Sequence, residues 1–211
     1  MKSIKSIFVI AAIIMAAIIV SPVAAFGFND QTAINQNNGF VGSQKIVVGQ
    51  SGMFNDQTAG NQNAIFAFAG VQKITGSQSG MFNTQESYNV NAFFSTAGTQ
   101  KIVVGQSGVF NTQEASNWNK RVVGTQEIVG FQSGASNDQF AGNNNEGFAG
   151  VQKITVGQSG MFNEQTAGNN NNGAVGVQEI TGFQSGMFNT QNIGNNNNGV
   201  AGSQIVVAIQ G

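Results

Sequence analysis

The fold of this chain is decided by residues 44–63, which read QKIVVGQSGMFNDQTAGNQN. Related stretches recur along the chain. The counterparts of Asn55, at intervals of 26 or 28 residues, are Asn29, Asn83, Asn111, Asn137, Asn163 and Asn189. Self-similarity at a fixed period in the range of about 20–50 residues is typical of stacked repeat architectures. Seven repeats therefore fill the chain after its first 25 residues.

The recurring positions within one repeat lie an even number of residues apart. Gln57 and Asn61 follow Asn55 by two and six residues, and the other repeats keep these offsets. Successive side chains of a β-strand point to opposite faces, so even offsets place these residues on one face. Each repeat therefore predicts two short strands, such as 55–63 and 72–78. We expect an all-β fold, a β-solenoid with cross-β stacking in seven two-stranded repeats of 26–28 residues.

Glycine marks the turn that leads from one repeat into the next. The segment Ser79-Gly80-Met81 is one such turn, and its glycine suits a backbone with positive φ. The following Met81-Phe82 pair and its counterparts form an apolar ridge, either packed at a corner of the core or free for lateral contact. Two repeats are longer, at 64–68 and 92–96, which predicts surface loops there. The predicted turn glycines are Gly52, Gly80, Gly108, Gly134, Gly160 and Gly186.

In-register stacking would place identical amide side chains above one another along the solenoid axis. Adjacent strands lie about 4.8 Å apart, so seven layers would extend roughly 35 Å. A stacked amide donates to one neighbouring layer and accepts from the other, which satisfies it without water. An unpaired buried amide would cost roughly 1–3 kcal/mol. The predicted ladder residues are Gln44, Gln50, Asn55, Gln57, Asn61, Gln72, Gln78, Asn83, Gln100, Gln106, Asn111, Gln126, Gln132, Asn137, Gln152, Gln158, Asn163, Gln178, Gln184, Asn189, Gln204 and Gln210.

The composition argues against catalysis and against metal or cofactor binding. Charged residues make up 8% of the chain, the formal net charge is −1, and histidine and cysteine are absent. Histidine is the commonest general base and the commonest transition-metal ligand. The sequence contains no phosphate-binding or metal-binding motif. We therefore expect no enzyme activity and no cofactor, and the near-neutral charge gives no electrostatic reason to bind nucleic acid.

The N-terminus has the features of a secretory signal peptide. Lys2 and Lys5 precede an apolar run over residues 7–20, and Val23-Ala24-Ala25 offers small residues for cleavage. This run is shorter than the roughly 18 residues that a membrane-spanning helix needs. We expect a signal peptide over 1–25 and a repeat domain over 26–211 that is secreted to the cell surface or beyond, with no membrane attachment after cleavage. A retained signal anchor is the alternative.

The last repeat differs from the others at one outward column. That column reads Lys45, Lys73, Lys101, Glu127, Lys153, Glu179 and then Ile205. The last predicted strand is therefore an apolar edge without charge, whereas monomeric solenoids carry polar caps. This edge predicts stacking against another copy. We expect the free monomer to be largely disordered until it meets a template, because a thin core has to offset a large ordering entropy.

The junction between repeats resembles the curlin repeat of curli fibre subunits, whose pattern is Ser-x5-Gln-x-Gly-x2-Asn-x-Ala-x3-Gln. Here Gln44-x5-Gln50-x-Gly52-x2-Asn55-x-Gln57-x3-Asn61 keeps every spacing, although the family's Ser, Ala and final Gln are replaced. The core of the pattern recurs at Gln78-x-Gly80-x2-Asn83, Gln106-x-Gly108-x2-Asn111, Gln132-x-Gly134-x2-Asn137, Gln158-x-Gly160-x2-Asn163 and Gln184-x-Gly186-x2-Asn189. The resemblance covers essentially all of residues 26–211.

The resemblance implies a subunit that is secreted unfolded, nucleated at the cell surface and built into a biofilm matrix. It also implies a nucleator subunit and a secretion apparatus as partners, with polymerisation carried by columns of the Gln50 and Asn55 type. The sequence thus predicts a homopolymer that stacks end to end into extracellular amyloid-type fibres for surface adhesion. Two alternatives stay open: a monomeric surface-displayed solenoid that acts as an adhesin or binds carbohydrate, and a cell-envelope sheath protein.

Overall fold

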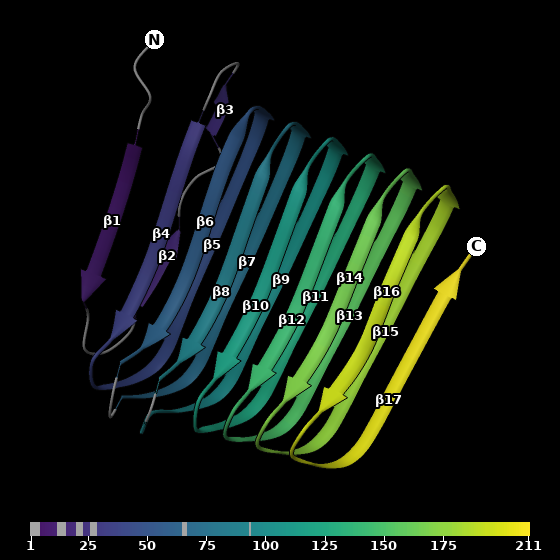
Figure 1. Ribbon diagram of the computed structural model, residues 1–211. Coiled ribbons are helices and arrows are strands. Elements are labelled where there is room, and N and C mark those ends of the chain that lie inside the picture. The colour runs from purple at the N-terminus through teal and green to yellow at the C-terminus, as the bar shows by residue number, and fades with distance from the viewer. Residues whose placement is uncertain (1–4, 12–15, 20–22, 26–28, 65–66, 93) are drawn as a thin grey trace.

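The computed structural model describes residues 5–11, 16–19, 23–25, 29–64, 67–92 and 94–211, and every regular element in them is a β-strand. From β4 onward the strands wind into a parallel solenoid whose successive turns, here called coils, rise toward the yellow C-terminal end in Figure 1. The predicted fold class is confirmed. The described residues include no helix that is long and apolar enough to cross a membrane.

Each coil contributes one strand to each of two sheets. The first sheet has the order β1 (Lys5–Ala11), β4 (Asn29–Asn37), β6 (Asn55–Asn63), β8 (Thr84–Asn91), β10 (Thr112–Asn119), β12 (Asp138–Asn145), β14 (Glu164–Asn171) and β16 (Thr190–Asn197). The second has the order β2 (Ala16–Ile19), β5 (Phe40–Met53), β7 (Phe68–Met81), β9 (Thr96–Val109), β11 (Val122–Ala135), β13 (Phe148–Met161), β15 (Ala174–Met187) and β17 (Val200–Gln210), while β3 (Val23–Ala25) pairs with β5. The first coil is therefore β4 with β5, and the seventh is β16 with β17.

Equivalent residues of neighbouring coils pair in register. Gln57 lies opposite Gln85 in the first sheet, and Ile102 lies opposite Ile128 in the second. A slip of one residue would turn the whole inward face of a strand to solvent, so the register is strongly specified. The two insertions leave it intact because they fall between strands, after Asn63 and after Asn91.

The second strand of each coil is longer than the sequence predicted. The predicted segment was 72–78, whereas β7 runs over Phe68–Met81 and includes its turn glycine. Pairing continues through residues of low β propensity because identical strands lie on both sides. The chain reverses only after the strand, at Phe82, whose φ is 54°.

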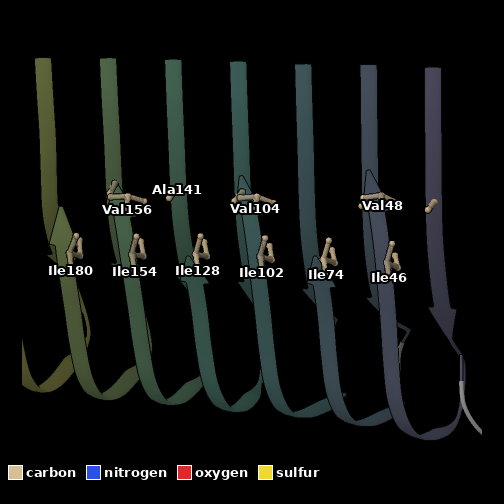
Figure 2. Packing of buried hydrophobic residues seen from close by; sticks show 14 residues of the cluster. Ile46, Val48, Ile74, Ile102, Val104, Ile128, Ala141, Ile154, Val156 and Ile180 are labelled. Atoms are coloured by element: carbon tan, nitrogen blue, oxygen red, sulfur yellow. The ribbon is translucent and has the colours of Figure 1, made fainter. Parts of the chain in front are cut away.

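The apolar core is a narrow double column between the two sheets. Ile46, Ile74, Ile102, Ile128, Ile154 and Ile180 are fully buried, one in each of the first six coils. Figure 2 shows these isoleucines as an even row, with Val48, Val104 and Val156 beside them in alternate coils. An alanine column of the first sheet faces them. The remaining inward positions are filled largely by amides, so the core is as thin as the sequence predicted.

Part of the segment predicted as a signal peptide pairs with the first coil. Strand β1 lies beside β4, and β2 and β3 lie beside β5. These pairings occupy the N-terminal edge of the repeat domain in the full chain. The cleavage boundary at residue 25 stays a prediction.

Candidate functional site: amide ladders and open edges

In the described residues, six columns of buried amide side chains run parallel to the solenoid axis, and in five of them the amides bond one another. In the column that contains Gln57, Gln85 and Gln113, the Nε2-to-Oε1 distances between neighbouring coils are 2.5 and 3.1 Å. In the column of Asn61 and Asn89 the corresponding Nδ2-to-Oδ1 distance is 3.0 Å. These side chains are buried, and within the stack an amide bonds its counterparts above and below, as the sequence predicted. Toward the two ends, atoms of Gln31, Asn35 and Gln184 have no partner among the described residues.

The hydrogen bonds of the ladders have a fixed direction. Every glutamine column donates toward the N-terminal coil, as when Gln113 donates to Gln85. The inner asparagine columns donate toward the C-terminal coil, as when Asn89 donates to Asn117 at 2.9 Å. The second amide hydrogen of Asn89 has a backbone acceptor in the opposite sheet, the carbonyl of Lys101 at 3.2 Å. The ladders therefore have distinguishable ends.

The marker asparagines hold the turn between coils. Asn111 Nδ2 donates to the carbonyl oxygen of Gly80 at 3.2 Å, and its Oδ1 accepts from the backbone N–H of Asn83 at 2.9 Å. The turn glycine of the same coil, Gly108, has a φ of 130°, and a Cβ there would collide with Gly80 O. All six predicted turn glycines have φ between 112° and 130°. Only glycine adopts this conformation without strain.

Most of the predicted ladder residues lie together in the interior. All of those from Gln44 through Gln184 are buried, Asn189 is half-buried, and Gln204 and Gln210 of the last coil are exposed. The equivalent amides of the other repeats, which the even offsets from Asn55 place on the same inward face, are buried as well. They include Gln85, Gln113, Gln139, Gln165, Asn89, Asn117, Asn143, Asn169, Asn63, Asn91, Asn119, Asn145 and Asn171.

The structure places the phenylalanine ridge outside the core. Phe82 and Phe110 are 46% and 53% exposed, and their ring centroids are stacked 5.1 Å apart. Both have a φ near 55°, which costs a residue with a Cβ about 1–2 kcal/mol. Sequence reasoning missed this strain, although Phe recurs two residues after the turn glycine. Packing at the corner of the core is therefore excluded for these two rings, and lateral contact stays a prediction.

The outward charged column forms ion pairs along the axis. Lys101 and Glu127 approach within 2.8 Å, and Lys153 and Glu179 within 3.2 Å. In the seventh coil, the residue that lies next to Glu179 in this outward column is the uncharged Ile205. A set of apolar side chains on β17 stays 40–48% exposed: Ile205, Val206, Val207 and Ile209.

Carboxylates gather on the outer face of the first sheet at its N-terminal half. Burial raises the pKa of Glu86, and the neighbouring charges of Glu114 and Asp56 raise it further. Burial also raises the pKa of Asp56, with Asp30 adding to the effect and the backbone N–H of Gln57 opposing it. Ionisation of these groups therefore opposes folding.

The two ends of the ladders carry complementary groups. In the first coil, Gln31 Nε2 and Asn35 Oδ1 are buried and have no hydrogen-bond partner in the described structure. In the seventh coil, Gln191 donates toward Gln165 at 2.6 Å, and Asn195 Nδ2 donates to Ile205 O at 3.2 Å and more weakly to Gln178 O at 3.4 Å. In the glutamine column, Gln31 of the first coil thus has an unused donor, and Gln191 of the seventh coil presents an acceptor. In the asparagine column, Asn35 of the first coil has an unused acceptor, and Asn195 of the seventh coil presents its amide nitrogen.

Comparison with known proteins adds no relative: no family model, no curated protein and no solved structure matches this chain.

Proposed function

We propose that this chain is a secreted structural subunit that stacks end to end with copies of itself into an extracellular fibre for surface adhesion and biofilm matrix. The observation that carries the proposal is the complementarity of the two ladder ends. If the seventh coil of one copy lies on the first coil of the next, Gln31 Nε2 meets Gln191 Oε1. In the same register, Asn35 Oδ1 meets Asn195 Nδ2.

Energetics favour such a junction. Each unpaired buried amide group costs roughly 1–3 kcal/mol, and stacking would remove that cost for Gln31 and Asn35 of the first coil. The exposed apolar side chains of β17 would also be covered, since Val206 belongs to the column that is fully buried at Ile180. Removal of residues 1–25 would free the edges of β4 and β5 to receive the next copy.

The curlin resemblance supports the same proposal through the spacing of Gln50, Gly52 and Asn55. A nucleator subunit and a dedicated secretion apparatus belong to the proposal as partners of the fibre. A fibre of this kind acts mechanically and through its surface, so it needs neither a catalytic group nor a cofactor.

A matched pair of substitutions on β17 tests the stacking. Val206→Lys places a charge on the inward face, where a second copy would bury it, and Val207→Lys places the same charge on the outward face. The two side chains are similarly exposed in one chain, at 45% and 40%, so both variants should tolerate the charge equally well as monomers. We expect Val206→Lys to abolish fibre elongation, because an unpaired buried charge is strongly unfavourable. Val207→Lys should elongate like the original chain.

Elongation is measured by light scattering and negative-stain microscopy on the chain from residue 26 onward, and fibre diffraction should give the strand spacing of about 4.7 Å along the axis. Equal elongation of both variants would refute end-to-end stacking. Discrete monomers at high concentration would favour the monomeric adhesin, and ordered tubes or sheets would favour the sheath.

A further inference from the structure

A groove runs along the outer face of the first sheet over its last four strands. These strands, β10, β12, β14 and β16, form the teal-to-yellow part of that sheet in Figure 1. The groove encloses about 430 Å³. Its floor consists of Ser116, Gly142, Gly168 and Gly194, which are neighbours in register on β10, β12, β14 and β16. The groove is therefore parallel to the solenoid axis.

The floor is open at Gly168 and Gly194, whereas the Phe140 ring lies 3.2 Å from the place of a Cβ at Gly142. The backbone does not require glycine in this column. The same column holds Ile34, Gly60 and Tyr88 in the earlier coils, so bulky side chains fit there. The Tyr88 ring covers Gly60, whereas an added Cβ at Gly194 would meet nothing within 4 Å. Glycine in a strand interior costs roughly 0.5–1 kcal/mol relative to alanine. In strands it often marks a place where a ligand or another backbone comes close.

The walls combine aromatic rings with amides. Trp118 and Phe140 are 41% and 45% exposed, and both line the groove. Lys120 Nζ lies 5.2 Å from the Trp118 ring centroid, a cation–π contact that orients the ring. Asn144, Asn170 and Asn196 follow Trp118 in the same column, one in each coil.

One wall amide has an unused acceptor. Asn170 Nδ2 reaches Asn144 Oδ1 at 3.5 Å, but the buried Asn170 Oδ1 has no hydrogen-bond partner among the described residues. A buried polar atom without a partner is rare in folded proteins and suggests a group that is supplied from outside. The Oδ1 atom is covered in the described structure, so a hydroxyl in the groove would satisfy it after a rotation of the Asn170 side chain.

We propose that this groove binds a neutral, extended, β-linked glycan chain that lies along the solenoid axis. The amides recur with the strand spacing of about 4.8 Å, which is close to the length of one sugar residue in such a chain. Each amide offers both a donor and an acceptor to sugar hydroxyls. The Trp118 ring offers an apolar face for the C–H face of a sugar. Glu114 lines the groove and Lys120 lies beside its Trp118 wall, so the two charges balance and favour a neutral glycan.

The single tryptophan of the chain, Trp118, makes the test direct. Cellohexaose, a neutral β-1,4-linked oligosaccharide, is titrated into the protein while Trp118 fluorescence is followed. We expect a saturable change with cellohexaose and none with an anionic oligogalacturonate of similar length. All lining residues belong to one chain, so the groove needs no junction between copies. Because we expect the free monomer to be largely disordered, the titration is made on assembled, folded protein.

Glycine substitutions separate binding from folding. Gly168→Val and Gly194→Val fill the floor with a residue of high β propensity, so the fold should persist while the fluorescence response is lost. Gly105→Val is the matched control, because Gly105 is an equally open strand glycine on the other sheet, and it should retain the response. The proposal is overturned if cellohexaose gives no change, or if the filled variants respond like the original. It is also overturned if Gly168→Val alters only the lateral bundling of fibres, which would assign the groove to a neighbouring copy.

Discussion

At the scale of single residues, Ser87 interrupts a column in which its neighbours on both sides are Ala59 and Ala115. Its hydroxyl is buried and has no hydrogen-bond partner in the described structure. We expect Ser87→Ala to raise the free energy of unfolding by about 1 kcal/mol, because an unsatisfied buried hydroxyl carries a desolvation cost. The denaturant midpoint of the folded material measures the change.

Ser95 is the matched control for Ser87. It is equally buried, but its Oγ donates to Asn91 Oδ1 at 2.6 Å. Ser95→Ala should therefore lower the midpoint while Ser87→Ala raises it. A fall in both variants would mean that Ser87 has a partner that the structure does not reveal.

Glu86 gives the chain a pH dependence with a definite sign. Its pKa and that of Asp56 lie above their ordinary values of 4.5 and 3.8. The folded state therefore holds these protons more tightly than the unfolded state. The contribution of these two groups to the free energy of unfolding should be greatest at a pH below their ordinary pKa values. It should fall as the pH rises through their raised pKa values.

Glu86→Gln should flatten this part of the stability profile and stabilise the protein at pH 7, because it removes a charge stacked on Glu114. Glu146→Gln, at an exposed turn, is the control and should leave the slope unchanged. Denaturant midpoints between pH 3 and 8 measure both. A wild-type profile that rises over the carboxyl range would contradict the assigned cause.

At the scale of the strand, valine and glycine alternate beside the isoleucine column. Val104 and Val156 fill the core in the third and fifth coils, and Gly130 lies between them. An added Cβ at Gly130 would lie 2.9 Å from Gln139 Nε2. The amide ladder thus occupies the space that a valine would need.

We expect Gly130→Val to destabilise the protein by about 1–3 kcal/mol, because overpacking displaces Gln139 from its ladder. Gly105→Val, on the outward face of the neighbouring strand, should be neutral or slightly stabilising. The denaturant midpoints of the two variants, each compared with that of the original chain, measure these changes in stability. If Gly130→Val were harmless, the Val–Gly alternation would have no packing role.

At the scale of the whole molecule, each coil contacts only its neighbours, so stability accumulates layer by layer. In the chain from residue 26 onward the two end coils would each lack one neighbour, and the seventh exposes its ladder amides. We expect the mature monomer to exchange its amide hydrogens rapidly and the fibre to protect all seven coils. Hydrogen exchange followed by mass spectrometry distinguishes the two. Strong protection in a dilute monomer would show that one chain is stable without stacking.

Much of the fold could be predicted because the repeat period specifies which residues lie next to one another in neighbouring coils. A fixed period places equivalent residues one layer apart, and the even offsets from Asn55 to Asn61 identify the inward face. The turn glycines were predictable for the same reason, since positive φ favours Gly80 and its counterparts. Strand length was not predictable from propensity, because pairing between identical strands carries β7 through its glycines.

The sequence by itself determined the all-β class, the in-register stacking and the identity of the buried amides, because periodicity and alternation are properties of the chain. Only the tertiary structure decided the donor direction of each ladder, the exposure of the phenylalanine ridge and the glycine-floored groove. These depend on how side chains lean across neighbouring coils. Tyr88 covers Gly60 while Gly194 stays open, although both glycines occupy the same column. Such choices follow from packing between residues that are distant in sequence, and no local pattern encodes them.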